Sequence, residues 1–439
     1  MTNTLQDQIE AGTARIGVIG LGYVGLPLLL EFAKGGFPVL GFDIDSAKTD
    51  ALKSATSYIR HIPEDTIAAV FSRGPERADA TTDFTRTSEC GALLICVPTP
   101  LTRNREPDLR FVESTARTIA PYLQAGQLVI LESTTFPGTT DEVLVPILEH
   151  GSGLAAGRDF HVAYSPERED PNNRQYRTST IPKVVGGRTA ACLAAARALY
   201  DAVICETVPV SDCRTAEATK LMENIFRSVN IALANELKTV FSRMNIDIWE
   251  VIRAASTKPF GYMPFYPGPG LGGHCIPIDP FYLTWKAREY GITTRFIELA
   301  GEINTSMPGY VVERIALALN ERGKPLRDSR ILLVGLAYKR NVDDDRESPT
   351  YAVWSGLLER GARVDYYDPH CPVVRPSREH SDLAGQRSVT WDGIAETAYD
   401  AAVVITAHDG VHHDKLAEWT EVVVDTRGVC RPADNVVRA

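Results

Sequence analysis

Three things are missing from this sequence: paired cysteines, a long apolar run and an excess of positive charge. The eight cysteines are scattered, and none has C-x-x-C or zinc-type spacing, which indicates a reducing compartment. No apolar stretch reaches the roughly 18 residues of a membrane span, and no signal-peptide pattern opens the chain. The formal net charge of −10 excludes a general nucleic-acid binder, which needs a basic face. We therefore expect a soluble cytoplasmic protein with no metal, membrane or nucleic-acid partner.

The length and the order of apolar segments predict several domains. A chain of 439 residues is too long for one core. Strand-like runs alternate with helical stretches, first near the N-terminus and again from about Ser329. The predicted fold is α/β, with two Rossmann-like doubly wound parallel-sheet domains joined by a long central helix. We place the boundaries at residues 1–210, 211–322 and 323–439.

The first strand runs into a dinucleotide-binding fingerprint. Residues 20–25 read G-L-G-Y-V-G, and Asp43 ends the next strand, as the fingerprint requires. The glycines allow a pyrophosphate to approach the helix N-terminus, and a carboxylate at Asp43 accepts ribose hydroxyls and repels a 2′-phosphate. NAD is therefore favoured over NADP. The alternative for Asp43 is a solvated turn residue, a role that suits Asp45 better.

Polar turns follow the later strands of the first domain. Pro98 and Thr99 follow one strand, Ser133 and Thr134 the next, and the S-P-E-R turn at 165–168 a third. Ligands of such sheets bind beyond the C-terminal ends of the strands, so these turns are expected beside the cofactor and substrate.

Residues 267–282 read P-G-P-G-L-G-G-H-C-I-P-I-D-P-F-Y and present Cys275 in a backbone with few side chains. Asp279 follows four residues later as a possible base. A nucleotide cofactor with a nucleophilic thiol predicts trapping of an aldehyde as a thiohemiacetal, oxidation to a thioester and hydrolysis to an acid. The alternative is a small buried cysteine, which a Gly/Pro-rich loop does not favour.

A helical pattern without glycine or proline runs from Arg214 to about Ala255 and predicts one long helix. Lys220 and Asn224 are i,i+4 neighbours on it, and a solvated polar stripe explains the pair as well as a site does. In the second α/β domain, Lys339 and Arg346 follow the first strand and suit phosphate. The acidic run at 343–345 equally fits a solvated loop.

These motifs together resemble the UDP-glucose/GDP-mannose dehydrogenase family. G-L-G-Y-V-G-L-P, S-P-E-R, E-x-x-K-x-x-x-N, G-G-H-C and the A-Y-K…D-x-R-E-S turn occur in family order over nearly the whole chain. The forms G-P-G-L-G-G-H-C-I-P-I-D-P and S-P-E-R-E-D-P-N-N are most similar to the branch that oxidises UDP-N-acetylglucosamine. In the UDP-glucose branch apolar residues follow S-P-E, where this chain has Arg168 and Glu169. Local substrate contacts should therefore differ from that branch.

The resemblance implies roles for named residues. The catalytic set is Cys275, Lys220, Asn224, Asp279, Glu167 and Thr134. The NAD-binding set is Gly20, Gly22, Tyr23, Val24, Gly25, Asp43, Pro98, Thr99, Ser133, Thr134 and Arg346. The substrate-binding set is Glu167, Arg168, Lys220, Asn224, Tyr266, Gly272 and Lys339. The aromatic segment 260–267 is a possible specificity loop, although its rings equally suit packing.

The implied activity is a four-electron, NAD-dependent oxidation of C6 of UDP-N-acetylglucosamine, for surface polysaccharide precursors. UDP-N-acetylmannosamine is the next candidate, before UDP-glucose and GDP-mannose. A non-catalytic NAD-binding regulator is a remote alternative, because the thiol, Lys220 and Asp279 are all present. The apolar stripe Ile225, Val229, Ala232, Leu233, Leu237 and Val240 predicts a homodimer or higher homo-oligomer, unless the stripe is covered within one chain.

Overall fold

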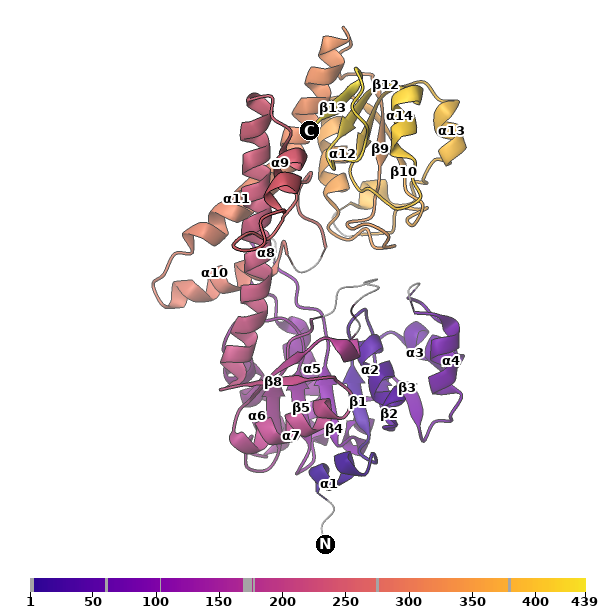
Figure 1. Cartoon of the computed structure of the whole chain (residues 1–439). Helices are drawn as coiled ribbons and strands as arrows, with labels where there is room; N and C mark the ends of the chain where they lie inside the picture. Colours follow the sequence, from indigo (N-terminus) through magenta and orange to yellow (C-terminus); the bar gives the residue numbers. More distant parts are fainter. Residues whose placement is uncertain are drawn as a thin grey trace. The chain divides into compact units, whose positions relative to one another are not determined.

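The structure is a computed structural model that describes residues 4–59, 62–102, 104–168, 176, 178–273, 276–377 and 380–439. It divides into two compact units, drawn in sequence colours in Figure 1. Unit 1 comprises Met1–Glu223 and Phe281–Ile292, and unit 2 comprises Asn224–Pro280 and Thr293–Ala439. Each unit is described by itself below.

Unit 1 is built on an eight-stranded sheet with the order β3-β2-β1-β4-β5-β6-β7-β8. The strands are β1 (Ile16–Ile19), β2 (Val39–Phe42), β3 (Ala78–Thr81), β4 (Ala92–Ile95), β5 (Leu128–Leu131), β6 (His161–Tyr164), β7 (Lys183–Gly187) and β8 (Thr207–Val210). Neighbouring strands are parallel except β6 and β7. Every residue of β1, β2, β4 and β5 is buried, as expected of strands with helices on both faces.

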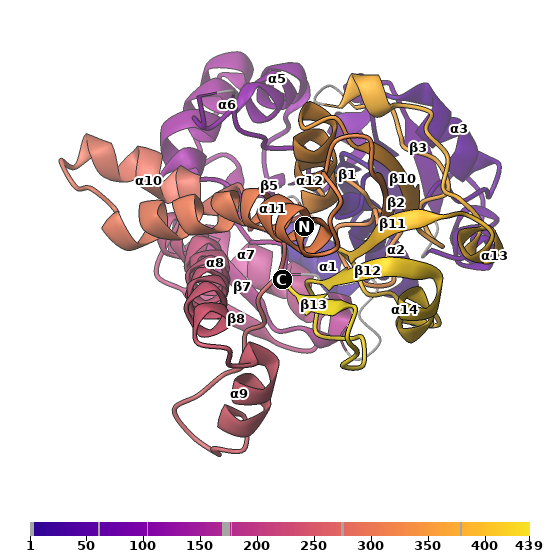
Figure 2. The ribbon, with the colours of Figure 1, turned by 90° about the horizontal axis from the view of Figure 1, so that it is seen from above.

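Helices cover both faces of this sheet, as the view in Figure 2 shows. The helices are α1 (Leu5–Glu10), α2 (Gly25–Lys34), α3 (Ser46–Lys53), α4 (Glu64–Phe71), α5 (Arg110–Ile119), α6 (Val145–Ser152) and α7 (Ala190–Asp201). On one face α1, α2, α4 and α7 pack against the strands, and on the other α5 and α6 do. Shorter turns of helix are η1 (Phe84–Glu89), η2 (Ala120–Tyr122), η3 (Thr140–Leu144) and η4 (Thr178–Thr180).

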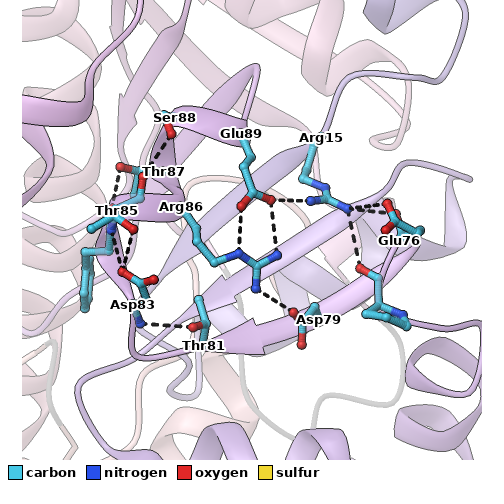
Figure 3. A network of polar contacts seen from close by, with 12 residues as sticks. Arg15, Glu76, Asp79, Thr81, Asp83, Thr85, Arg86, Thr87, Ser88 and Glu89 are labelled. Atoms are coloured by element: carbon cyan, nitrogen blue, oxygen red, sulfur yellow. Dashed lines mark hydrogen bonds and ion pairs between the residues drawn. The ribbon is translucent and has the colours of Figure 1, made fainter.

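A polar network fixes the edge strand β3, as Figure 3 shows. Arg86 in η1 binds Asp79 of β3 at 2.7 Å and Glu89 at 2.8 Å, and Arg15 binds the same glutamate at 2.5 Å. Because these side chains are partly exposed, each pair adds only about 0.2–1 kcal/mol. The network anchors η1 beside an unpaired strand edge.

Unit 2 contains a five-stranded sheet with the order β10-β9-β11-β12-β13. Its strands are β9 (Arg330–Val334), β10 (Arg363–Tyr367), β11 (Tyr399–Val404), β12 (Thr420–Asp425) and β13 (Val436–Arg438), all parallel. Helices α11 (Arg295–Glu321) and α12 (Pro349–Glu359) cover one face, and α13 (Trp391–Ala395) and α14 (Leu416–Trp419) cover the other. The remaining short turns are η5 (Ser381–Leu383) and η6 (His413–Lys415).

The fold class predicted from the sequence is confirmed: two Rossmann-like parallel sheets are joined by the long helix α8 (Cys213–Arg243). The predicted extent of that helix, to about Ala255, is wrong. Asn245 has a left-handed φ of 57°, which ends the helix, and Asp247 caps a separate helix, α9 (Ile248–Ala255), by accepting from the Trp249 N–H. In the described part of the chain, no helix has the length and apolar character of a membrane span.

Candidate functional site

The turn between β1 and α2 leaves room for a ligand at one glycine and for none at the other two. Gly20 has a φ of +92°, and a Cβ there would lie 2.6 Å from the carbonyl oxygen of Cys96. A Cβ at Gly25 would lie 1.9 Å from the Gly20 oxygen, whereas one at Gly22 would meet no atom within 4 Å. No side chain caps the N-terminus of α2, which follows Val24 directly. The turn is therefore shaped to admit a phosphate.

Asp43 follows β2 and is only 6% exposed. Its carboxylate accepts from the Leu21 N–H at 2.9 Å and the Asp45 N–H at 3.0 Å, so it ties the glycine turn to the end of β2. Asp45 instead caps α3, accepting from Ala47 N–H at 2.9 Å. Lys48, which the sequence reading missed, binds Asp43 at 3.0 Å. The solvated-turn alternative for Asp43 is therefore wrong.

The ends of β4 and β5 are joined by Ser133. Its hydroxyl donates to the carbonyl oxygen of Val97 at 2.7 Å, which shapes the turn that holds Pro98 and Thr99. The hydroxyl of Tyr282, from the 281–292 segment of the same unit, donates to the Thr99 oxygen at 2.7 Å. The predicted cofactor turns are thus brought to one edge of the sheet.

The role that the family resemblance implies for Thr134 has a second candidate in the adjacent Thr135. Thr134 is half-buried, whereas Thr135 is fully buried and its Oγ1 has no hydrogen-bond partner among the described residues. The role of Thr134 stays a prediction, and Thr135 is a neighbour that sequence spacing alone did not single out.

A buried ionic group lies behind the S-P-E-R turn and was not anticipated. Glu132, at the end of β5, binds Lys183 of β7 at 2.7 Å and accepts from the hydroxyl of Tyr200. Lys183 also donates to the Pro166 oxygen at 3.3 Å. Burial raises the pKa of Glu132, while Lys183 opposes this. The group lines a cavity together with Val24, Leu28, Glu167 and Arg168. Its two charges are 51 residues apart, beyond any local motif.

Lys220 is buried, with 3% of its surface exposed, so the solvated-stripe alternative is wrong for it. Its ammonium donates to the Glu167 backbone oxygen at 2.5 Å and lies 3.3 Å from the Glu167 carboxylate. The Arg168 guanidinium pairs with the Glu223 carboxylate at 2.7 Å and donates to the Pro182 backbone oxygen at 2.6 Å. Unit 1 therefore brings the predicted Glu167 and Lys220 together.

In unit 2, Asn224 and Asp279 meet although they are 55 residues apart. The Asn224 amide donates to the carboxylate of Asp279, the first residue of α10 (Asp279–Glu289), and Arg227 donates to the Asn224 oxygen. Both partners are at most 3% exposed. Cys275, a further residue of the predicted site, lies outside the described residues, as does Glu169, which differs from the UDP-glucose branch.

The glycines of the loop before Cys275 are required by packing in unit 2. Gly273 has a φ of +85°, and a Cβ there would lie 2.8 Å from the Tyr338 ring. A Cβ at Gly272 would lie 2.9 Å from the Tyr338 Cβ. Tyr266, at the start of the loop, is 53% exposed. The loop therefore packs directly on the turn that follows β9.

That turn carries the predicted Lys339 and Arg346. Lys339 is half-buried. The Arg346 guanidinium makes a bidentate contact with the Asp344 carboxylate, with hydrogen bonds of 2.9 and 2.6 Å. Asp344 and Asp345 are 6% and 4% exposed, and the Tyr351 hydroxyl donates to Asp345 at 2.5 Å. The solvated-loop alternative is therefore wrong for these two acids.

Three family models match the chain. They are the NAD binding domain (residues 14–204), the central domain (214–306) and the UDP binding domain (332–432) of the UDP-glucose/GDP-mannose dehydrogenase family. A UDP-N-acetyl-D-glucosamine 6-dehydrogenase from Salmonella typhi is 34% identical, covering 90% of each chain. An NDP-N-acetyl-D-galactosaminuronic acid dehydrogenase from Ralstonia solanacearum is 34% identical, covering 96% of this chain and 97% of that protein. The structure of a UDP-D-ManNAc dehydrogenase from Pyrococcus horikoshii is 32% identical, with a TM-score of 0.86, covering 96% of this chain and 98% of that one.

Proposed function

Since the chain belongs to the UDP-glucose/GDP-mannose dehydrogenase family and is an NAD-dependent nucleotide-sugar dehydrogenase, we propose that it oxidises C6 of UDP-N-acetylglucosamine to the carboxylate. The observation that carries the proposal is the buried hydrogen bond between Asn224 and Asp279. The Asp279 carboxylate is only 3% exposed, and the desolvation cost of burying a carboxylate favours a role in chemistry for it.

The residues of unit 1 fit NAD. Gly22 opens onto free space at the N-terminus of α2, and Asp43 is held at the end of β2 to accept ribose hydroxyls. NAD would supply the hydride acceptor for both oxidations, one NAD molecule for each.

The first oxidation removes a hydride from C6 and a proton from its hydroxyl, giving an aldehyde. Glu167, half-buried against Lys220, is the proposed acid–base group or holder of a water for this proton. No covalent bond to the protein is needed at this step, so Cys275 is not required for it.

In the second oxidation the Cys275 thiolate adds to the aldehyde carbon and a C–S bond forms. Loss of a hydride from C6 then gives a thioester. Water attacks the thioester, the C–S bond breaks, and the acid and thiolate are released. The Lys220 ammonium stabilises the oxyanion, a contribution of about 3–4 kcal/mol for one such donor. Asp279, oriented by Asn224, and Thr134 are proposed to activate the water.

The assay that tests the proposal measures NADH formed per sugar consumed with UDP-N-acetylglucosamine. We expect two NADH and no free aldehyde, because Cys275 retains the intermediate. A panel of UDP-N-acetylmannosamine, UDP-glucose and GDP-mannose then ranks the alternatives. If NAD binds but no sugar reduces it, the chain is a non-catalytic NAD-binding protein instead.

We also propose a homodimer or a multiple of it. Among the stripe residues on α8, Leu233, Leu237 and Val240 are 52%, 36% and 45% exposed, whereas Ala232 is buried. Exposed leucines in a row on one helix favour a second copy over packing within the chain. Light scattering at micromolar concentration tests this, and the mass of a single active chain would contradict it.

A further inference from the structure

Lys238 on α8 is a buried cation with no hydrogen-bond acceptor among the described residues. Only 3% of its surface is exposed, and its Nζ has no partner in the described part of unit 2. The ammonium lies over the rings of Trp249 and Tyr310, at 5.7 and 5.5 Å from their centres. Such contacts offset only about 2 kcal/mol of a desolvation cost that is several kcal/mol. The fold alone therefore does not account for a lysine here.

Other cations surround Lys238 within unit 2. The positive charges of Arg314 on α11 and of Arg427, which follows β12, both lower the pKa of Lys238. The Arg314 Nε likewise has no acceptor among the described residues. The nearby carboxylate, Asp425, is already occupied: it accepts from the Arg427 and Gly428 N–H groups at 2.9 Å each and pairs with Arg438. The cluster thus has an excess of positive charge.

This cluster adjoins the glycine loop. Asn235, one turn before Lys238 on α8, accepts from the Gly268 N–H at 2.9 Å. A Cβ at Gly268 would lie 2.6 Å from an Nη atom of Arg427. Arg427 itself is partly exposed and lies in the segment matched by the UDP binding domain.

We propose that Lys238 is an anion-recognition residue that, with Arg427, binds the diphosphate of the nucleotide sugar. Arg427 contacts the phosphate oxygens, and Lys238 provides the second positive charge behind it. This inference rests on the proposed function, because a UDP-linked substrate is what supplies the diphosphate. Arg427 Nε donates to the Ile405 oxygen at 2.6 Å, but this bond brings no negative charge, and an anion is the ligand that a desolvated group of cations prefers.

The charge on Lys238 should respond to the ligand. Burial lowers its pKa to about 7; Arg427 and Arg314 lower it as well, and Asp425 raises it. A bound diphosphate raises the pKa again, so above pH 7 binding should take up a proton. Affinity for UDP should then fall as the pH rises from about 7 through the pKa of the complex.

The test compares UDP with uridine by calorimetry on the whole chain and on Lys238→Met, in two buffers of different ionisation enthalpy. Methionine keeps the apolar stem between Trp249 and Tyr310. We expect about tenfold weaker UDP binding, an unchanged uridine affinity and loss of the proton uptake. Lys258→Met is the matched control, because Lys258 also lies over an aromatic ring, Phe260, but is exposed.

Lys238→Arg should retain UDP binding but lose its pH dependence, because an arginine does not titrate in this range. An unchanged ratio of UDP to uridine affinity in Lys238→Met would overturn the inference, whether or not the melting temperature falls. If UDP binds through Lys238 but no UDP-sugar reduces NAD, the proposed function fails and this inference stands.

Discussion

The two sheets of this protein place an aspartate at the same position and use it differently. Asp43 follows β2 beside the Gly20 turn, and Asp368 follows β10 beside the Gly335 turn. Asp43 accepts one N–H of its turn and keeps a partly exposed ion pair with Lys48. Asp368 is fully buried and accepts from the Leu336 and Ala337 N–H groups at 2.6 and 2.8 Å.

A second difference between the two aspartates is that Asp368 pairs with His408. Its Nδ1 accepts from the Asn341 N–H at 2.9 Å, so its Nε2 carries the proton toward Asp368, 3.0 Å away. In unit 1 the helix α2 starts directly after the glycine turn, whereas in unit 2 α12 starts only at Pro349. Both aspartates accept from a glycine turn, but Asp43 also pairs with a partly exposed lysine, whereas the further partner of Asp368 is a buried histidine. The same strand–turn–strand unit therefore does not imply the same ligand.

Replacing Cys275 with serine should have the largest effect and should separate ligand binding from chemistry. A hydroxyl is a far weaker nucleophile than a thiolate at neutral pH, so uronate formation should fall at least about a thousandfold. NAD and UDP affinities, measured by calorimetry, should stay within about twofold, because the substitution leaves the binding turns of both sheets intact. Cys205→Ser, at an exposed free cysteine, is the control. Near-normal turnover of the Cys275 variant would remove this residue from the nucleophile role.

Asp368→Ala should destabilise unit 2 by about 3–5 kcal/mol, because it leaves backbone donors and His408 buried without an acceptor. Urea unfolding followed by tryptophan fluorescence measures the loss. Asp43→Ala, with fewer buried partners, should cost much less. Equal losses for the two variants would mean that the aspartates have the same structural role.

The acid sensitivity of unit 2 should follow Asp368. Burial raises its pKa, but hydrogen bonds from His408 and backbone N–H groups outweigh this and bring it to about 2, below the ordinary 3.8. A lowered carboxyl pKa gives stability that is complete above pH 4 and is lost as the pH falls toward 2, about 2 kcal/mol in all. Unfolding free energies at pH 5 and pH 2.5 should therefore differ by less in Asp368→Asn. The same pH slope in both proteins would assign it to other carboxylates.

Asp43→Ala should have the smallest effect, on cofactor choice. Loss of the ribose acceptor should weaken NAD by about tenfold, while NADP should weaken less, because the repulsion of its phosphate is also lost. Lys48 already offsets part of that repulsion at 3.0 Å, so the preference should narrow without reversing. The measurement is kcat/KM for both cofactors. An unchanged preference would place the discriminating acid elsewhere.

Local sequence was enough where the chain itself sets the geometry. The glycine turn at 20–25 and the buried strands β1, β2, β4 and β5 follow from glycine conformation and short apolar runs, and the structure has them where the pattern indicates. The end of α8 at Arg243 was missed, because the left-handed Asn245 and the cap at Asp247 are weak signals inside a helical pattern.

The sequence by itself determined the two α/β sheets, the NAD turn and the family, since these depend on residues close together in the chain. Only the tertiary structure decided which charges are buried and with what partners. Lys220 pairs with Glu167 across 53 residues, Lys183 reaches Glu132, and Lys238 is buried with no acceptor among the described residues. The energy of a charge depends on its desolvation and on groups brought near by folding, and neither can be predicted from the residues next to it in the chain.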